Sequence, residues 1–281
     1  MGKIRHILQS HFHNNNWTIT KPEDGQQKEC YIAQNGGFKV FLKFDVPVAP
    51  LRRLGELEVA PGVLTSGILD DRTYVIQEYI AGTYPDWQWF AHHLPLLAKF
   101  IKRYHDDEEL TAILSGGTKT SYHEHIEADI ADLEARFQTL DSSELHKPAI
   151  AEAFEMLKVQ AQGLQPVKLV PIHADPNTVN ILLTRDTLLM VDWDDIQLSD
   201  PMHDAGQLLW WYVARRQWDE FFTAYGLQMD EALLTRIHWW AARTSFAIAL
   251  WHVAHAYDCA SFLIDFVAAI HGKSNPHAVF R

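Results

Sequence analysis

The segment from His173 to Asn180 places an acidic residue and an amide residue at a spacing that can do chemistry. Asp175 follows His173 by two positions, and Asn180 follows Asp175 by five. Transfer of a phosphoryl group needs a carboxylate that accepts the proton of the attacking hydroxyl and an oxygen ligand that holds Mg²⁺. Both must stand on a rigid turn anchored by flanking strands. Asp175 fits the first role and Asn180 the second, so the segment predicts phosphoryl transfer.

Further carboxylates follow an apolar stretch a little later in the chain. Residues 188–191 predict a buried strand that runs directly into Asp192, with Asp194 two positions beyond. Mg²⁺ prefers hard oxygen ligands, usually one or two carboxylates completed by substrate phosphates and water. We therefore expect Asn180 and Asp192 to bind the metal, and Asp194 could assist them.

Asp200 and Pro201 predict the start of a helix that continues through 202–213. Aspartate is a favoured N-cap residue, and proline is favoured in the first helical turn. For Asp200 and for Asp204, which follows in the same helix, we expect a structural role and not a catalytic one.

The first 80 residues predict a small sheet with one helix. Short extended runs are broken by turn residues, and Asn35-Gly36-Gly37 between two of them indicates a hairpin. Residues 50–58 predict a short helix that Pro61 stops. The predicted strands are 17–20, 29–34, 38–44, 62–67 and 73–79.

After Gly82 the pattern becomes helical. Residues 87–105, 122–140 and 148–162 carry apolar residues at helical spacing, with Gly and Pro between them. One strand-rich stretch, 168–191, interrupts this helical part and contains the loop with Asp175. We find no internal repeat, and no linker long enough to separate independently folding domains.

The order and spacing of these motifs resemble the aminoglycoside phosphotransferase and choline kinase superfamily. The matching segments are 173–180, 191–195 and 200–204, a strand at 75–82 that resembles the family's hinge, and 38–43, which resembles its third strand. The resemblance covers nearly the whole chain. It implies an α+β, protein-kinase-like two-lobed fold, with a small antiparallel-sheet, nucleotide-binding N-lobe at residues 1–80. Residues 81–281 would form a larger, mainly helical C-lobe with the catalytic loop and the acceptor pocket.

The resemblance also implies an ATP- and Mg²⁺-dependent kinase that acts on a hydroxyl of a small molecule. Asp175 would be the catalytic base, and Asn180 and Asp192 would hold magnesium. Lys43 would contact the α- and β-phosphates, and backbone groups near Glu78 and Ile80 would hold adenine.

Several points of the nucleotide site stay open. The phosphate-covering loop would be residues 22–28, in which Gly25 is the single glycine. The acidic partner of Lys43 would be Glu56, with Glu58 as the alternative. Lys39 competes with Lys43, because their even spacing puts both on one face of a strand. GTP in place of ATP also fits.

Composition narrows the class of protein. The formal net charge of −12 repels phosphate backbones, so nucleic acid is not expected as the main ligand. Two cysteines are too few for a disulfide scaffold and favour a reducing cytoplasm. The late apolar stretch 246–270 predicts a buried helix and no membrane span, since His and Asp residues interrupt it. We expect a monomer or a homodimer.

The acceptor is the least determined part of the prediction. Six tryptophans crowd the segment 210–251, where the resemblance places the acceptor pocket. Aromatic faces bind ammonium groups, so an aminoglycoside-like or choline-like cation is one hypothesis. The alternative is that most of these tryptophans fill the helical core. Close-spaced histidines, His123 with His125 and His252 with His255, are better explained as helix-surface or core residues than as metal ligands.

Two rival classes differ in catalysis. A non-catalytic, nucleotide-binding relative that regulates a partner is the main alternative, and the presence of Asp175, Asn180 and Asp192 argues against it. A protein kinase is disfavoured because no Ala-Pro-Glu segment or long activation loop follows Asp192.

Overall fold

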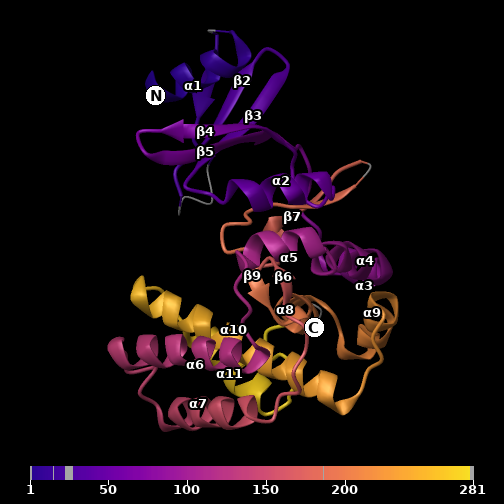
Figure 1. Ribbon diagram of the computed structural model, residues 1–281. Coiled ribbons are helices and arrows are strands. Elements are labelled where there is room, and N and C mark those ends of the chain that lie inside the picture. The colour runs from indigo at the N-terminus through magenta and orange to yellow at the C-terminus, as the bar shows by residue number, and fades with distance from the viewer. Residues whose placement is uncertain (1, 15, 23–27, 186, 279–281) are drawn as a thin grey trace. The chain divides into compact units, whose positions relative to one another are not determined.

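The computed structural model describes residues 2–14, 16–22, 28–185 and 187–278. It divides into two compact units; Figure 1 shows their helices and strands. Unit 1 is Met1–Tyr84 together with Val179–Asp195, and unit 2 is Pro85–Thr178 together with Ile196–Arg281. The sequence analysis divides the chain at residue 80, whereas unit 1 also includes a segment that comes about a hundred residues later. The assignment of nucleotide binding to residues 1–80 stays a prediction.

A five-stranded antiparallel sheet forms most of unit 1, in the order β1-β2-β3-β5-β4. The hairpin predicted at residues 35–37 is present, because Asn35 pairs with Phe38 across a two-residue turn. Gly36 adopts a φ of +57°, which glycine reaches without a steric penalty. The strands are β1 (Thr18–Thr20), β2 (Cys30–Asn35), β3 (Phe38–Phe44), β4 (Val63–Leu69) and β5 (Arg72–Glu78).

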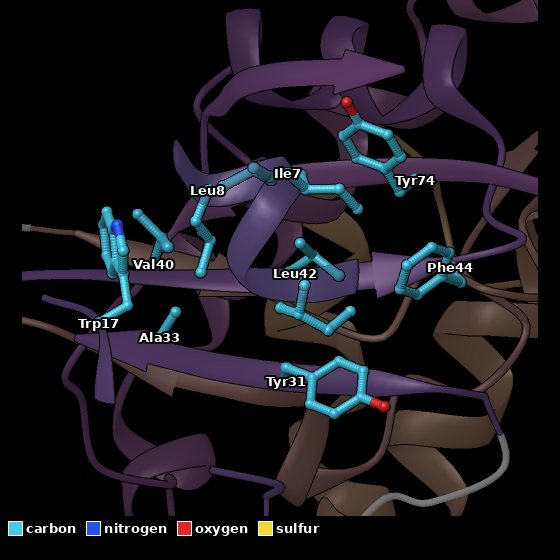
Figure 2. Close-up of a cluster of buried hydrophobic side chains, with 11 residues drawn as sticks. Ile7, Leu8, Trp17, Tyr31, Ala33, Val40, Leu42, Phe44 and Tyr74 are labelled. Carbon is cyan, nitrogen blue, oxygen red and sulfur yellow. The ribbon is translucent and has the colours of Figure 1, made fainter. Parts of the chain in front are cut away.

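Helix α1 (Gly2–Phe12) packs on one face of this sheet, and the sequence analysis did not predict it. Its buried residues Ile4, Ile7 and Leu8 recur at helical spacing. They join a core with the alternate residues Val40 and Leu42 of β3 (Figure 2). Most other residues of α1 are polar, so the helical spacing of its few apolar residues is a weak signal in the sequence.

Two more elements complete unit 1. Helix α2 (Val48–Glu56) begins and ends two residues before the predicted bounds. The hairpin of β7 (Ile181–Leu183) and β8 (Leu188–Met190) lies within the predicted strand-rich stretch 168–191, and β8 coincides with the strand predicted at 188–191. Backbone hydrogen bonds join it to the rest of unit 1: Thr83 N–H donates to Leu183 O at 3.0 Å, and Met190 N–H donates to Val59 O at 2.8 Å.

Unit 2 is helical around one short strand pair, β6 (Val170–Ile172) with β9 (Gln197–Ser199). Helix α8 is its centre, because every residue from Met202 to Trp210 is buried. A short 3₁₀ helix, η2 (Arg215–Gln217), is also present, and another, η1 (Thr178–Asn180), spans the boundary between the two units. The α-helices are α3 (Trp87–His92), α4 (Leu94–His105), α5 (Glu108–Ser115), α6 (Tyr122–Thr139), α7 (Pro148–Ala161), α8 (Pro201–Tyr212), α9 (Trp218–Tyr225), α10 (Glu231–Ala254) and α11 (Ala260–Ile270).

Two helix predictions for unit 2 need correction. The helical stretch 87–105 is two helices, α3 and α4, that meet at His93, where Pro95 lacks the N–H that a continuous helix would use. The predicted buried helix at 246–270 is also two helices. The chain breaks between them at Ala256, whose φ of +59° is incompatible with a right-handed helix.

None of the helices in the described part of the chain combines the length and the apolar character needed to cross a membrane.

Candidate active site

The loop that carries Asp175 begins where buried strand β6 ends. His173 is fully buried, and Ala174 turns the chain through a φ of +73°, an unfavourable conformation for a residue with a Cβ. The side chain of Asn177 donates to Asp175 Oδ2 at 2.9 Å, and the N–H of Asp175 donates to His173 Nδ1 at 3.3 Å. The Asp175 carboxylate is therefore oriented by its own loop.

Asp204 of α8 accepts hydrogen bonds from the backbone of this loop. Its Oδ2 accepts the N–H of His173 at 2.7 Å, and its Oδ1 accepts the N–H of Ala174 at 2.9 Å. The hydroxyl of Tyr104 donates to the same carboxylate at 2.8 Å, and His105 Nε2 lies 3.4 Å from it. These contacts offset the cost of the strained turn at Ala174 and fix the backbone on either side of it.

The charge of Asp204 depends on these donors. Complete burial favours the protonated acid and would raise the pKa of Asp204. The hydrogen bonds from His105 and from the backbone of His173 outweigh burial and lower the pKa of Asp204 to about 2. A charged aspartate can thus persist in the core of unit 2, as expected for the structural role predicted from the sequence.

Asp200 has the predicted capping role at the start of α8. Its Oδ1 accepts the N–H of Met202 at 2.8 Å. Its Oδ2 accepts the hydroxyl of Tyr122 at 2.8 Å and lies 3.2 Å from Arg236 Nε. The prediction of an N-cap is confirmed.

In unit 1, Lys43 meets two of the predicted carboxylates. Lys43 Nζ lies 2.6 Å from Asp192 Oδ1 and 2.6 Å from Asp194 Oδ1. Burial would lower the pKa of the Lys43 ammonium, but the Asp192 and Asp194 carboxylates outweigh it and raise the pKa above its usual value. Residues about 150 positions apart in sequence therefore form one charged cluster, which we call the lysine–aspartate cluster.

The β7–β8 hairpin positions the carboxylate side of this cluster. Val191 N–H donates to Asn180 O at 2.9 Å, just beyond the β7–β8 ladder. Asp192 then turns with a φ of +64°. Asn180 is buried. The structure thus places Asn180, Asp192 and Asp194 in unit 1, whereas Asp175 belongs to unit 2.

Lys39 and Lys43 differ in their contacts. Lys39 Nζ lies 3.6 Å from the ring centroid of Tyr79, whereas Lys43 reaches the acidic residues. Glu78, at the end of β5, donates its N–H to Gly62 O at 3.0 Å. Ile80 follows β5 and is half-buried. The assignment of adenine to Glu78 and Ile80 stays a prediction.

The predicted acidic partner of Lys43 lies elsewhere. Glu56 is exposed at the end of α2 and pairs with Arg53 at 3.1 Å. Glu58 follows the helix in a left-handed conformation. Gly25 lies outside the described residues.

Lys28 Nζ lies 3.5 Å from Asp194 Oδ2, a contact that the sequence did not predict. The sequence predicted Lys28 only as the last residue of the phosphate-covering loop 22–28. Cys30 stands opposite Lys43 in the β2–β3 register.

The histidine pairs have partners other than a metal. His125 Nε2 lies 2.8 Å from Ser199 Oγ, and His255 Nδ1 lies 2.8 Å from the Trp251 carbonyl oxygen. Across the residues that the structure describes, no three His, Cys, Asp or Glu side chains are grouped to hold a metal ion. A magnesium site completed by an amide and by phosphates needs no such group.

Comparison with known proteins identifies the family of the chain. The profile of the family described as "Phosphotransferase enzyme family" matches residues 67–240, more than half of the chain. The chain belongs to this family. The predictions of the family and of a phosphotransferase enzyme are confirmed.

Solved structures confirm the predicted kinase-like α+β fold. Aminoglycoside phosphotransferase APH(4)-Ia, in a ternary complex with AMP-PNP and hygromycin B, matches with a TM-score of 0.70 and 17% identity, over 96% of this chain and 98% of that one. Spectinomycin phosphotransferase APH(9)-Ia, in complex with ADP and spectinomycin, gives 0.68 and 13% over 96% of each chain. A choline/ethanolamine kinase family protein from Mesorhizobium loti gives 0.68 and 18% over 98% of this chain and 95% of that one.

Proposed function

We propose that this phosphotransferase transfers the γ-phosphoryl group of ATP to a hydroxyl of a small molecule in the presence of Mg²⁺. The observation that carries the proposal is the lysine–aspartate cluster. It joins a cation able to bind phosphate oxygens to carboxylates able to bind a metal, from segments 149 residues apart. Two of the structural neighbours hold AMP-PNP or ADP, which supports a nucleotide as the phosphoryl donor.

The donor set fits magnesium. Asp192 offers a carboxylate that is 47% exposed, and Asn180 offers an amide at the start of the same hairpin. Two such ligands leave room for the phosphates and water that magnesium keeps in kinase sites. Bound there, the ion would neutralise charge that develops on the transferred phosphoryl group.

The residues of the chain then divide the work. Asp175 orients the acceptor hydroxyl and accepts its proton. The hydroxyl oxygen forms a bond to the γ-phosphorus while the bond from phosphorus to the β–γ bridging oxygen breaks, and ADP leaves with that electron pair. Lys43 binds phosphate oxygens of the nucleotide. Backbone groups near Glu78 and Ile80 hold adenine.

We propose that the acceptor is a cation. The net charge of −12 would attract one. The neighbours named above include phosphotransferases of aminoglycosides and a choline/ethanolamine kinase family protein. Most of the candidate tryptophans are unavailable, because Trp210, Trp218, Trp239 and Trp240 are buried in the core. Trp251 is 37% exposed, and its ring stacks on that of His255 with the ring centroids 4.1 Å apart, so only its exposed part could contact an acceptor.

An assay of ADP release tests the proposal. Purified protein with ATP and Mg²⁺ is offered aminoglycosides, choline, ethanolamine, homoserine and neutral sugars. We expect one cationic hydroxyl compound to stimulate ADP release and to gain a phosphate, seen by mass spectrometry. A strong preference for neutral sugars or homoserine would overturn the cationic acceptor. Nucleotide binding without acceptor-stimulated turnover across the panel would instead support a regulatory nucleotide-binding protein.

A further inference from the structure

The two aspartates of the lysine–aspartate cluster differ in their contacts. Asp192 contacts Lys43 through one oxygen. Asp194 uses both of its oxygens, with Oδ1 at 2.6 Å from Lys43 Nζ and Oδ2 at 3.5 Å from Lys28 Nζ. Asp194 therefore pairs with two lysines that come from different segments of unit 1.

The two aspartates also differ in solvent exposure, and Asp194, which has more contacts, is the less exposed. The side chain of Asp192 is 47% exposed, whereas that of Asp194 is 16% exposed, close to the 12% of Lys43. A carboxylate that solvent reaches can exchange one cation for another. A largely enclosed carboxylate between two ammonium groups would take a charged partner away from both of them if it turned to a different cation, which is unfavourable for buried charge.

The difference in exposure decides which aspartate can stay paired with Lys43 when a metal binds at Asp192. A metal ion on Asp192 competes with the Lys43 ammonium for the same carboxylate, because both are cations. Lys43 is too enclosed to go without an anionic partner. No glutamate of α2 contacts Lys43 among the residues described, since Glu56 pairs with Arg53 and Glu58 follows the helix end. Asp194 is the carboxylate that can stay with Lys43.

We propose that Asp194 is the positioning residue for Lys43, in the place that the family resemblance gives to a helix glutamate, and that it is not a metal ligand. This inference rests on the proposed function, because it assumes that Lys43 binds nucleotide phosphates and that Asp192 binds the metal. Asp194 also ties Lys28 to the same point and thereby brings a second ammonium group beside the phosphate-binding lysine.

The experiment compares matched variants, Asp192→Asn and Asp194→Asn, by calorimetry. One series titrates Mg²⁺ at fixed ADP, and the other titrates ADP at saturating Mg²⁺. We expect Asp192→Asn to raise the Mg²⁺ midpoint about tenfold or more, and Asp194→Asn to move it less than about twofold. Equal shifts in the two variants would make Asp194 a metal ligand and overturn the proposal.

A double-mutant cycle supplies the readout that a merely structural role would not move. We expect Asp194→Asn to raise the Kd for ADP about fivefold with Lys43 in place, and less than about twofold in the Lys43→Met background. Equal effects in both backgrounds, or no effect with Lys43 in place, would overturn the proposal. Thermal unfolding of each variant without ligand shows that it folds. If the wild-type protein binds no nucleotide, the proposed function itself fails, which separates the two outcomes.

Discussion

Asp192 in unit 1 and Asp204 in unit 2 are two carboxylates with opposite situations. Asp192 is half exposed and contacts one lysine. Asp204 is completely enclosed and accepts hydrogen bonds from two backbone N–H groups and from Tyr104. Solvent reaches the first, whereas the second cannot leave its partners without disrupting the core around it. The same side chain is thus accessible in one unit and a fixed part of the core in the other.

The most damaging change should be Asp204→Ala. It leaves the N–H groups of His173 and Ala174 and the hydroxyl of Tyr104 without their acceptor in the core. We expect a loss of about 3–5 kcal/mol in the free energy of unfolding, typical of a broken buried charge network. Denaturant unfolding followed by tryptophan fluorescence measures it. A loss below about 1 kcal/mol would show that the loop does not depend on Asp204.

Asp175→Ala should affect turnover and leave stability nearly unchanged, because Asp175 stands in a loop and not in the core. We expect the rate of transfer to fall about 10²- to 10⁴-fold, as for loss of a general base, with the Kd for nucleotide unchanged. Coupled ADP release and calorimetry measure the two quantities. Retention of near-normal turnover would refute the assignment of Asp175 as the base.

The pH dependence of stability should report Asp204 directly. Its folded-state pKa of about 2 lies below the usual value of about 3.9 in an unfolded chain. The charged form therefore contributes stability that is fully present above about pH 4 and is lost as pH falls towards about 2. The contribution amounts to about 2–3 kcal/mol. Urea unfolding between pH 2 and 6 should show this loss in the wild type, and Asp204→Asn should lack it. The same slope in both proteins would contradict the assignment.

The smallest expected effect belongs to an ion pair in which one partner is exposed. Arg53 and Glu56, three residues apart on α2, lie 3.1 Å from each other with Glu56 exposed. We expect Arg53→Gln to change the free energy of unfolding by less than about 0.5 kcal/mol. A change above 1 kcal/mol in thermal or urea unfolding would mean that Arg53 has a further role in unit 1.

The sequence predicted most elements that periodicity or turn chemistry marks strongly. β3, the hairpin at Gly36 and the capped start of α8 are found where expected, because local rules decide them. Helix α1 was missed, since only three of its residues are buried. The breaks at His93 and Ala256 were missed because apolar spacing continues across them.

The candidate site, too, could be predicted only in part from the sequence. The candidate catalytic and metal residues could be chosen from motif order, but the partner of Lys43 could not. Glu56 and Asp194 are both acidic, and only the fold of the β7–β8 hairpin brings one of them to Lys43. Such contacts between residues about 150 positions apart depend on tertiary packing, which no local pattern records.

The distribution of cysteines has a practical consequence. The chain has two, and each unit contains one buried thiol, Cys30 on β2 in unit 1 and Cys259 just before α11 in unit 2. A pulse of an alkylating reagent therefore labels each half only when that half opens. Peptide mass spectrometry can then time the opening of both halves in the native polypeptide, without engineered probes, and show which one nucleotide protects.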